Sequence, residues 1–133
     1  MIKKIFVRTS EHEQLIDITS KIRQIVRDSN IIEGRVTVFI PHTTAAVTIN
    51  ENADPDVQHD LIIALNRISP DLTEFRHMEG NSDAHTKSSI VGCSEDIIVS
   101  EGKLLLGTWQ GIYLCEHRDR GGSRRLVLTA FGE

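Results

Sequence analysis

Residues 96–131 read DIIVSEGKLLLGTWQGIYLCEHRDRGGSRRLVLTAF, and this stretch decides the fold class. It is rich in apolar and β-branched residues, and glycines at positions 102, 121 and 122 interrupt it where a chain can reverse direction. The pattern predicts strands at 96–100, 103–106, 108–116 and 125–131. The second half of the chain is therefore expected to consist mainly of strands separated by turns.

The first half of the chain adds further strands and a helix. Apolar or alternating residues predict strands at 2–8, 14–18, 35–40 and 46–49. Between the second and third of these lies a helical pattern. Thr19 or Ser20 is its expected N-cap, and Asn30 or Gly34 its expected end.

Two more helices are expected in the middle of the chain. The first begins at Asp54 and Pro55, because an acidic N-cap followed by proline is a frequent helix start. Its apolar residues recur at helical spacing and predict a buried stripe at Val57, Leu61, Ala64, Leu65 and Ile68. A shorter helix starts near residue 81 and is closed by Gly92.

This order of elements is not the regular alternation of strand and helix that forms a parallel sheet. It predicts the α+β class, a mainly antiparallel sheet or sandwich with two or three helices packed on it. The chain has 133 residues and no internal repeat or linker, so we expect residues 1–133 to form one domain.

Composition excludes several classes of protein. The net charge is −4 and the pI is about 5.8, which argues against a nucleic-acid-binding protein. No apolar stretch is long enough to cross a membrane, and the N-terminal MIKKIFVRT is typical of a strand rather than a signal peptide. Two cysteines are too few for a disulfide framework, and Cys93 is expected to be buried. We therefore expect a cytoplasmic protein.

Polar residues concentrate in three places. His42, Thr43 and Thr44 follow a strand end, where binding residues are common, although the threonines could equally satisfy the backbone of a turn. His77 and His85, with Asn81 between them, offer nitrogen and oxygen ligands suited to a divalent ion. Both histidines could equally be ordinary surface or core residues.

The third concentration lies at the start of the second helix. Asn50 and Glu51 precede it, while capping and the helix dipole account for Asp54 and Asp56. Asp60 is expected to flank the buried stripe, where it could be a metal ligand, a base or a cap partner. Farther along, the basic run 117–125 could meet a phosphate-bearing molecule or form a solvated hairpin loop.

Taken together, these motifs resemble those of the YjbQ-like family, also called the secondary thiamine-phosphate synthase family. The resemblance covers about residue 36 to the end and is most specific at GTWQ, residues 107–110. Where the family has a short acidic turn after Glu116, this chain has the longer loop 117–123, so the roles of Arg118 and Arg120 are open. The resemblance implies a homotrimer that joins a hydroxymethylpyrimidine diphosphate to a thiazole phosphate and releases diphosphate.

For such a reaction, side chains can be matched to roles. Metal ligation is expected from His42, His77 and His85, with Mg²⁺ and Zn²⁺ both open. Catalysis is expected from Asp60, Glu51 and Glu116. The phosphorylated substrate is expected to contact Thr43, Thr44, Asn50, Asn81, Gln110 and Arg124. A metal-dependent phosphate or ester hydrolase, and a non-catalytic trimer that binds a small anionic metabolite, remain alternatives.

Overall fold

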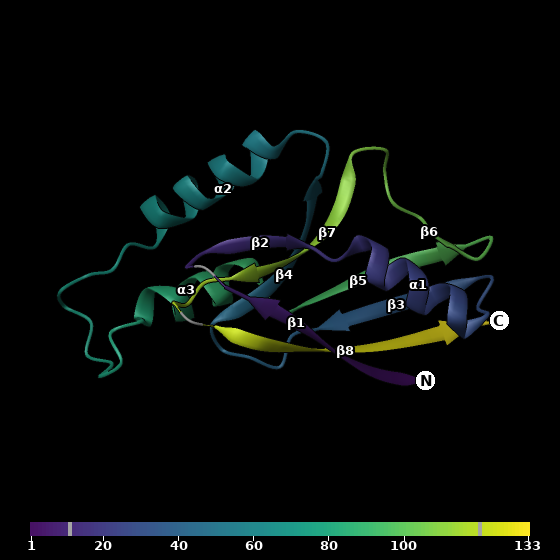
Figure 1. The fold of residues 1–133 in the computed structure, drawn as a ribbon, viewed down its shortest axis with the longest axis horizontal. Coiled ribbons are helices and arrows are strands. Elements are labelled where there is room, and N and C mark those ends of the chain that lie inside the picture. The colour runs from purple at the N-terminus through teal and green to yellow at the C-terminus, as the bar shows by residue number, and fades with distance from the viewer. Residues whose placement is uncertain (11, 120) are drawn as a thin grey trace.

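A computed structural model describes residues 1–10, 12–119 and 121–133 (Figure 1). It contains a five-stranded sheet in the order β1-β8-β3-β5-β6 and a three-stranded sheet in the order β2-β7-β4. All the neighbouring strands pair antiparallel, which confirms the predicted α+β class. The strands are β1 (Ile2–Thr9), β2 (Gln14–Asp17), β3 (Gly34–Phe39), β4 (Ala45–Glu51), β5 (Ser94–Ser100), β6 (Lys103–Leu104), β7 (Gln110–Glu116) and β8 (Gly122–Gly132).

The core lies between the two sheets. Val36 and Leu126 of the larger sheet and Val47 and Leu114 of the smaller one are fully buried members of a single hydrophobic cluster. Each such side chain contributes roughly 1.5–3 kcal/mol when it leaves water. The strand register follows from this burial, because a slip by one residue would turn these side chains toward solvent.

Helix α1 (Thr19–Ser29) closes one end of the core with Ile22 and Val26. Its N-cap is Ile18, so the prediction of Thr19 or Ser20 at this position was wrong. Asp17 supplies the missing acceptor instead: its Oδ1 accepts from the backbone N of Thr19 at 2.9 Å. Asn30 ends the helix in the left-handed region, as expected, at φ 59°.

Helix α2 (Pro55–Ile68) starts as predicted, with Asp54 Oδ1 accepting from the backbone N of Asp56 at 2.9 Å. The expected buried stripe is not there. None of residues 55–68, all of which are described, is buried, and Ile63 and Ile68 are exposed. Figure 1 shows why: α2 stands away from the two sheets. The apolar spacing was real, but this chain covers the stripe only in part: Val57, Leu61 and Leu65 are half-buried, whereas Ala64 and Ile68 are exposed.

Helix α3 (Ser82–Val91) packs beside β4 and ends at Gly92, as predicted. The helix is tied to the smaller sheet because Ser88 Oγ donates to the carbonyl of Ala45 at 2.7 Å. Cys93 follows it and is exposed, so the prediction of a buried cysteine was wrong there; Cys115 is the buried one, and burial raises the pKa of its thiol to about 12. Across the described residues, no helix has the length and apolar character needed to cross a membrane.

Candidate functional site

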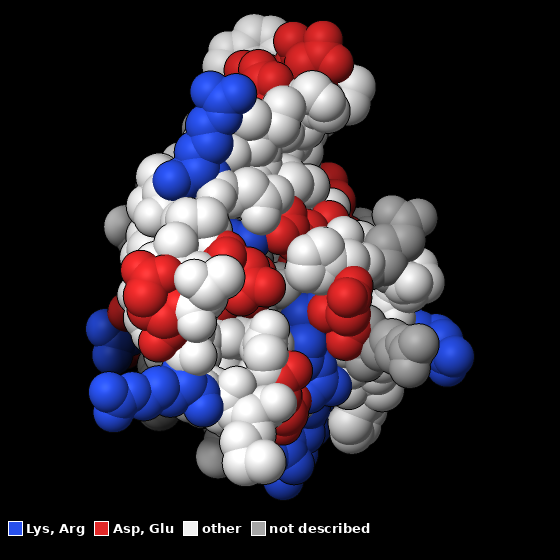
Figure 2. Space-filling model, turned by 90° about the vertical axis from the view of Figure 1, so that its left-hand side faces the viewer, with Lys and Arg blue, Asp and Glu red and all other residues white. Residues whose placement is uncertain are grey.

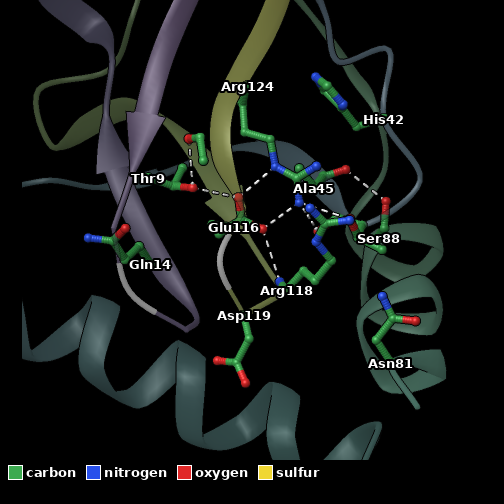
Figure 3. A network of polar contacts seen from close by, with 12 residues as sticks. Thr9, Gln14, His42, Ala45, Asn81, Ser88, Glu116, Arg118, Asp119 and Arg124 are labelled. Atoms are coloured by element: carbon green, nitrogen blue, oxygen red, sulfur yellow. Dashed lines mark hydrogen bonds and ion pairs between the residues drawn. The ribbon is translucent and has the colours of Figure 1, made fainter. Parts of the chain in front are cut away.

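The candidate site is built around a buried ion pair at one end of the sandwich. Glu116, the last residue of β7, is 0% exposed, and Arg124, near the start of β8, is 4% exposed. Arg124 donates from Nε to Glu116 Oε2 at 2.6 Å and from Nη2 to Oε1 at 2.5 Å (Figure 3). Two parallel bonds between a guanidinium and a carboxylate are among the strongest polar contacts in proteins.

Further donors complete the surroundings of the Glu116 carboxylate. Thr9 Oγ1 donates to it at 2.9 Å, and the backbone N of Arg118 at 3.0 Å. Burial alone would raise the pKa of Glu116, but the bonds from Arg124, Arg118 and Thr9 outweigh burial and lower this pKa. The carboxylate is therefore ionised and holds Arg124 in one orientation. A role for Glu116 as a base stays a prediction.

Gly121 lets the carboxylate occupy this place. A Cβ added at Gly121 would lie 1.8 Å from Glu116 Oε2 and 2.6 Å from Thr9 Oγ1. No side chain fits at those distances, because real Cβ atoms do not approach other atoms so closely. The glycine in the loop is thus required by the ion pair and not only by the turn.

A cavity of about 370 Å³ opens beside Arg124. Its walls come from the loop after β3, the loop before α3, α3 itself, the loop after β7 and the start of β8. Arg118 and Glu79 line it together with seven residues that sequence analysis had selected: His42, Thr43, Thr44, His77, Asn81, His85 and Arg124. The fold thus gathers residues that lie up to about eighty positions apart.

The threonines and His42 have defined roles in this cavity. Thr44 is buried and accepts from Arg124 Nη2 at its Oγ1, at 2.8 Å, so it helps to position the guanidinium. His42 Nε2 accepts from the backbone N of Arg125 at 2.9 Å, which leaves the ring proton on Nδ1. Burial and the charges of Arg124 and Arg125 lower the pKa of His42. Its imidazole is therefore neutral near pH 7.

His77 and His85 face each other across the mouth of the cavity. Their ring centroids lie 5.1 Å apart in an edge-to-face arrangement. At this separation, one ligand can contact both rings. Within the described part of the chain, however, no three His, Cys, Asp or Glu side chains are grouped to hold a metal ion. The divalent ion stays a prediction, with two imidazoles as its best-placed donors.

Four predicted site residues lie elsewhere in the chain: Asn50, Glu51, Asp60 and Gln110. Glu51 pairs with Gln110 at one end of the β4–β7 ladder, and Ala45 pairs with Glu116 at the other. Six residues of strand separate these ends by roughly 20 Å. Asp60 lies on the exposed helix α2, where its Oδ1 is 3.1 Å from His59 Nδ1. A single chain therefore does not bring these four residues to the cavity.

Sequence analysis missed a second polar cluster. Lys87 of α3 is 1% exposed, and its Nζ donates to Glu13 Oε1 and to Asn66 Oδ1, each at 2.6 Å. Burial would raise the pKa of Glu13, but bonds from Lys87 and Asn66 outweigh burial and lower it. Helical spacing could have predicted that Lys87 is buried, because Lys87 follows Ala84 by three residues and shares the buried face of α3 with it.

Next to this cluster lies a larger cavity, of about 890 Å³. His117 lines it and is 2% exposed, and burial followed by the charge of Lys87 lowers its pKa to about 4. The loop 117–123, whose roles were open, thus contributes Arg118 to both cavities. Arg120 lies outside the described residues.

Comparisons with known proteins agree on one family. The family described as "UPF0047 protein YjbQ-like" matches residues 3–133. UPF0047 protein MJ1081 of Methanocaldococcus jannaschii is 51% identical over 116 residues, which are 87% of this chain and 84% of that protein. UPF0047 protein YugU of Bacillus subtilis is 47% identical over 117 residues, 87% of this chain and 89% of that protein.

Solved structures show the same fold. A YjbQ/UPF0047 family protein from Clostridium acetobutylicum has a TM-score of 0.93 and 44% identity, and the alignment covers 97% of this chain and 99% of that one. A YbjQ-like protein of unknown function from Sulfolobus solfataricus has a TM-score of 0.95 and 30% identity over 100% of this chain and 97% of that one. The similarity extends over all or nearly all of this chain.

Proposed function

The chain belongs to the YjbQ-like UPF0047 family, and from this premise we propose that it binds a small phosphorylated substrate in the cavity beside Arg124 and transfers a group from it. One observation carries the proposal: hydrogen-bond donors from three separate segments line a single cavity. Two arginines, three histidines and two threonines are the donor types that bind phosphate oxygens.

The donors would divide the work between them. Arg124 already donates to Glu116 from Nε and Nη2. This guanidinium would therefore reach a ligand only through its remaining nitrogen, Nη1. Arg118, Thr43 and the two facing histidines stand closer to the open side and would contact the phosphate directly. Positioned donors of this kind stabilise charge that develops on a leaving group without reorganisation.

The specific reaction we propose follows from the resemblance to the secondary thiamine-phosphate synthase family. The bond between the pyrimidine methylene carbon and the diphosphate oxygen breaks, and its electron pair leaves with the diphosphate. The thiazole nitrogen supplies the electron pair of the new carbon–nitrogen bond. The donors of His77, His85 and Arg118 would take up the charge that gathers on the departing oxygens.

A divalent ion is a separate part of the proposal. His77 and His85 would supply two imidazoles, and further ligands would come from the substrate or from water, as is usual for magnesium at phosphates. With the ion bound, His77 and His85 would hold the ion, and the hydrogen bonds of Arg118 and Thr43 to the phosphate would remain. A cytoplasmic location belongs to the same proposal, because the exposed thiol of Cys93 would stay reduced there.

Assembly as a homotrimer is also proposed. It is supported by exposed apolar side chains on α2, Ile63 and Ile68, and by exposed Trp109. A neighbouring copy would cover these side chains and could bring Asp60 or Glu51 to a cavity that they do not reach within one chain. The roles predicted for these carboxylates therefore depend on the assembly.

Turnover tests this proposal. The full chain is supplied with hydroxymethylpyrimidine diphosphate, thiazole phosphate and Mg²⁺ or Zn²⁺, and product is followed by chromatography. We expect thiamine phosphate from the wild-type protein, and at least tenfold less from His85→Ala. His59→Ala is the matched control, because His59 is an exposed histidine on α2, outside the cavity.

A panel of phosphate esters is assayed in parallel. If inorganic phosphate is released from the esters and no thiamine phosphate is formed, the protein is a hydrolase and not a transferase. If inorganic diphosphate binds saturably and no substrate is turned over, the protein is a non-catalytic binding protein. If inorganic diphosphate does not bind at all, the cavity is not a phosphate site and the proposal fails.

A further inference from the structure

The two cavities adjoin each other. Glu79, Asn81 and Arg118 line both of them, so these residues form the boundary that they share. Beyond this boundary the chemistry of the walls changes. The smaller cavity has three histidines and two arginines, whereas the larger one adds Asp71, Asp83 and Asp119.

The larger cavity has an acidic wall. Figure 2 shows the side of the molecule that carries the α2–α3 loop, where acidic side chains gather in the middle of the face. The nearby buried cation offsets them only in part, because Lys87 Nζ is paired with Glu13 Oε1 at 2.6 Å and lies 3.8 Å from Asp83 Oδ2. Arg118 lines this wall together with His12, whose Nδ1 lies 3.0 Å from Asp119 Oδ1. Four carboxylates face them, those of Asp71, Glu79, Asp83 and Asp119.

Two polar atoms at this wall have no partner among the described residues. One is His117 Nε2, on a side chain that is 2% exposed, and the other is Asn81 Oδ1. Asn81 occupies the N-cap of α3, yet its side chain makes no capping bond; its Nδ2 donates to Glu79 Oε2 at 3.2 Å instead. Buried polar atoms normally have partners, so the two together mark a place for a ligand.

The chemistry of these atoms selects the kind of ligand. Asn81 Oδ1 can only accept a hydrogen bond, and the same is true of the ionised carboxylates around it. His117 Nε2 belongs to a neutral imidazole and can accept as well. A metal ion is not favoured, because the described residues contain no group of three ligands. What fits is an organic group that carries several N–H donors and a positive charge.

We propose that the larger cavity binds the amine-bearing end of the ligand whose phosphate lies in the smaller cavity. This inference rests on the proposed function, because it assigns the phosphate to the cavity beside Arg124. The site thus selects a phosphate ester with a basic, N–H-rich end over one with an apolar end. Asn81, at the shared boundary, contacts both ends and sets the distance between them.

The experiment compares two ligands that differ only in the amine. Binding of 3-aminopropyl phosphate, propyl phosphate and inorganic phosphate to the full chain is measured by calorimetry. We expect the amine to tighten binding by about tenfold, the effect of one hydrogen bond between a charged and a neutral group. Inorganic phosphate should bind with an affinity close to that of propyl phosphate.

Two variants locate the effect. His117→Phe keeps the ring and removes the unpartnered nitrogen, and Asp71→Asn removes one charge from an exposed position that lines only the larger cavity. Both should reduce the preference for the amine and leave the affinity for inorganic phosphate unchanged. If His117→Phe does not fold, as judged by its thermal melt, Asp71→Asn still provides the test.

The outcomes separate this inference from the proposed function. Equal affinity of the wild-type protein for both alkyl phosphates would overturn the inference, while binding of phosphate itself would stand. An amine preference that both variants retain would also overturn it, because the amine would then lie elsewhere. If neither inorganic phosphate nor either ester binds, the proposed function fails and the inference fails with it.

Discussion

Arg124 and Glu116 face each other inside the protein, and the guanidinium donates to both carboxylate oxygens at 2.6 and 2.5 Å. Glu116 has no solvent exposure and Arg124 almost none. The pair therefore joins the end of β7 to the start of β8 and holds Arg124 in the wall of the smaller cavity. An arginine that looked like a phosphate ligand in the sequence has its main partner within the chain.

Glu116→Gln should destabilise the protein strongly. The change keeps the shape of the side chain but leaves the charge of Arg124 buried without a counterion, which typically costs about 3–5 kcal/mol. Urea unfolding measures the difference in the free energy of unfolding. Glu79→Gln, at an exposed carboxylate, is the control and should change it by less than about 0.5 kcal/mol. A loss below about 1 kcal/mol in Glu116→Gln would contradict a structural role for the pair.

Stability should fall as pH decreases from neutral, and His117 is one cause. Its pKa in the folded protein is about 4, below the ordinary value of 6.5, so its contribution is complete above pH 6.5 and is lost between pH 6.5 and 4. A difference of this size corresponds to roughly 3 kcal/mol. The lowered pKa of Glu116 adds a further loss below about pH 4.5. Urea unfolding should show that the free energy of unfolding of His117→Phe depends less steeply on pH in this range than that of the wild-type protein. If both proteins show the same dependence on pH, His117 is protonated in the folded state over the same pH range as in the unfolded state.

Gly121→Ala should destabilise the protein because the new Cβ would meet Glu116 Oε2 at 1.8 Å. Either the carboxylate or the loop must move, and overpacking of this kind typically costs about 1–3 kcal/mol. The thermal midpoint of the variant is compared with that of Ser123→Ala, at an exposed position at the start of β8, two residues farther along. Equal midpoints for the two variants would mean that the loop takes up the methyl group freely.

Metal binding should depend on the facing histidines. His77→Ala and His85→Ala should each lower the zinc content after dialysis, because each removes one of two imidazoles whose centroids lie 5.1 Å apart. Neither change should alter the thermal midpoint by much, since His77 is exposed and His85 is partly exposed. Elemental analysis provides the readout, with His59→Ala as control. If both variants keep the zinc content of the wild-type protein, the metal is held by residues other than His77 and His85.

The apolar face of α2 should mediate assembly. Light scattering of the wild-type chain is expected to give three times the chain mass of 14.9 kDa, and Ile68→Ser should shift the mass toward the monomer. Ile98→Ser, at an exposed position on the larger sheet, is the matched control. If wild-type protein at micromolar concentration has the mass of one chain, neither a trimer nor a shared site is possible.

The candidate site could be predicted from sequence only in part. His42, Thr44, Asn81 and His85 were found because polar side chains at strand and helix ends are typical of binding sites. Lys87, Glu13 and His117 were missed, because each is an ordinary polar residue in its own segment. They become informative only through burial and through partners more than twenty residues away.

The sequence by itself determined the α+β class, most element bounds and the caps at Asp54, Asn30 and Gly92, because alternation, helical spacing and capping are local properties. Only the tertiary structure decided which polar residues meet. It paired Arg124 with Glu116, separated Glu51 from the cavity by the length of a strand, and left no residue of α2 fully buried. The physical reason is that burial and long-range pairing depend on how the two sheets are placed, and no local pattern specifies that placement.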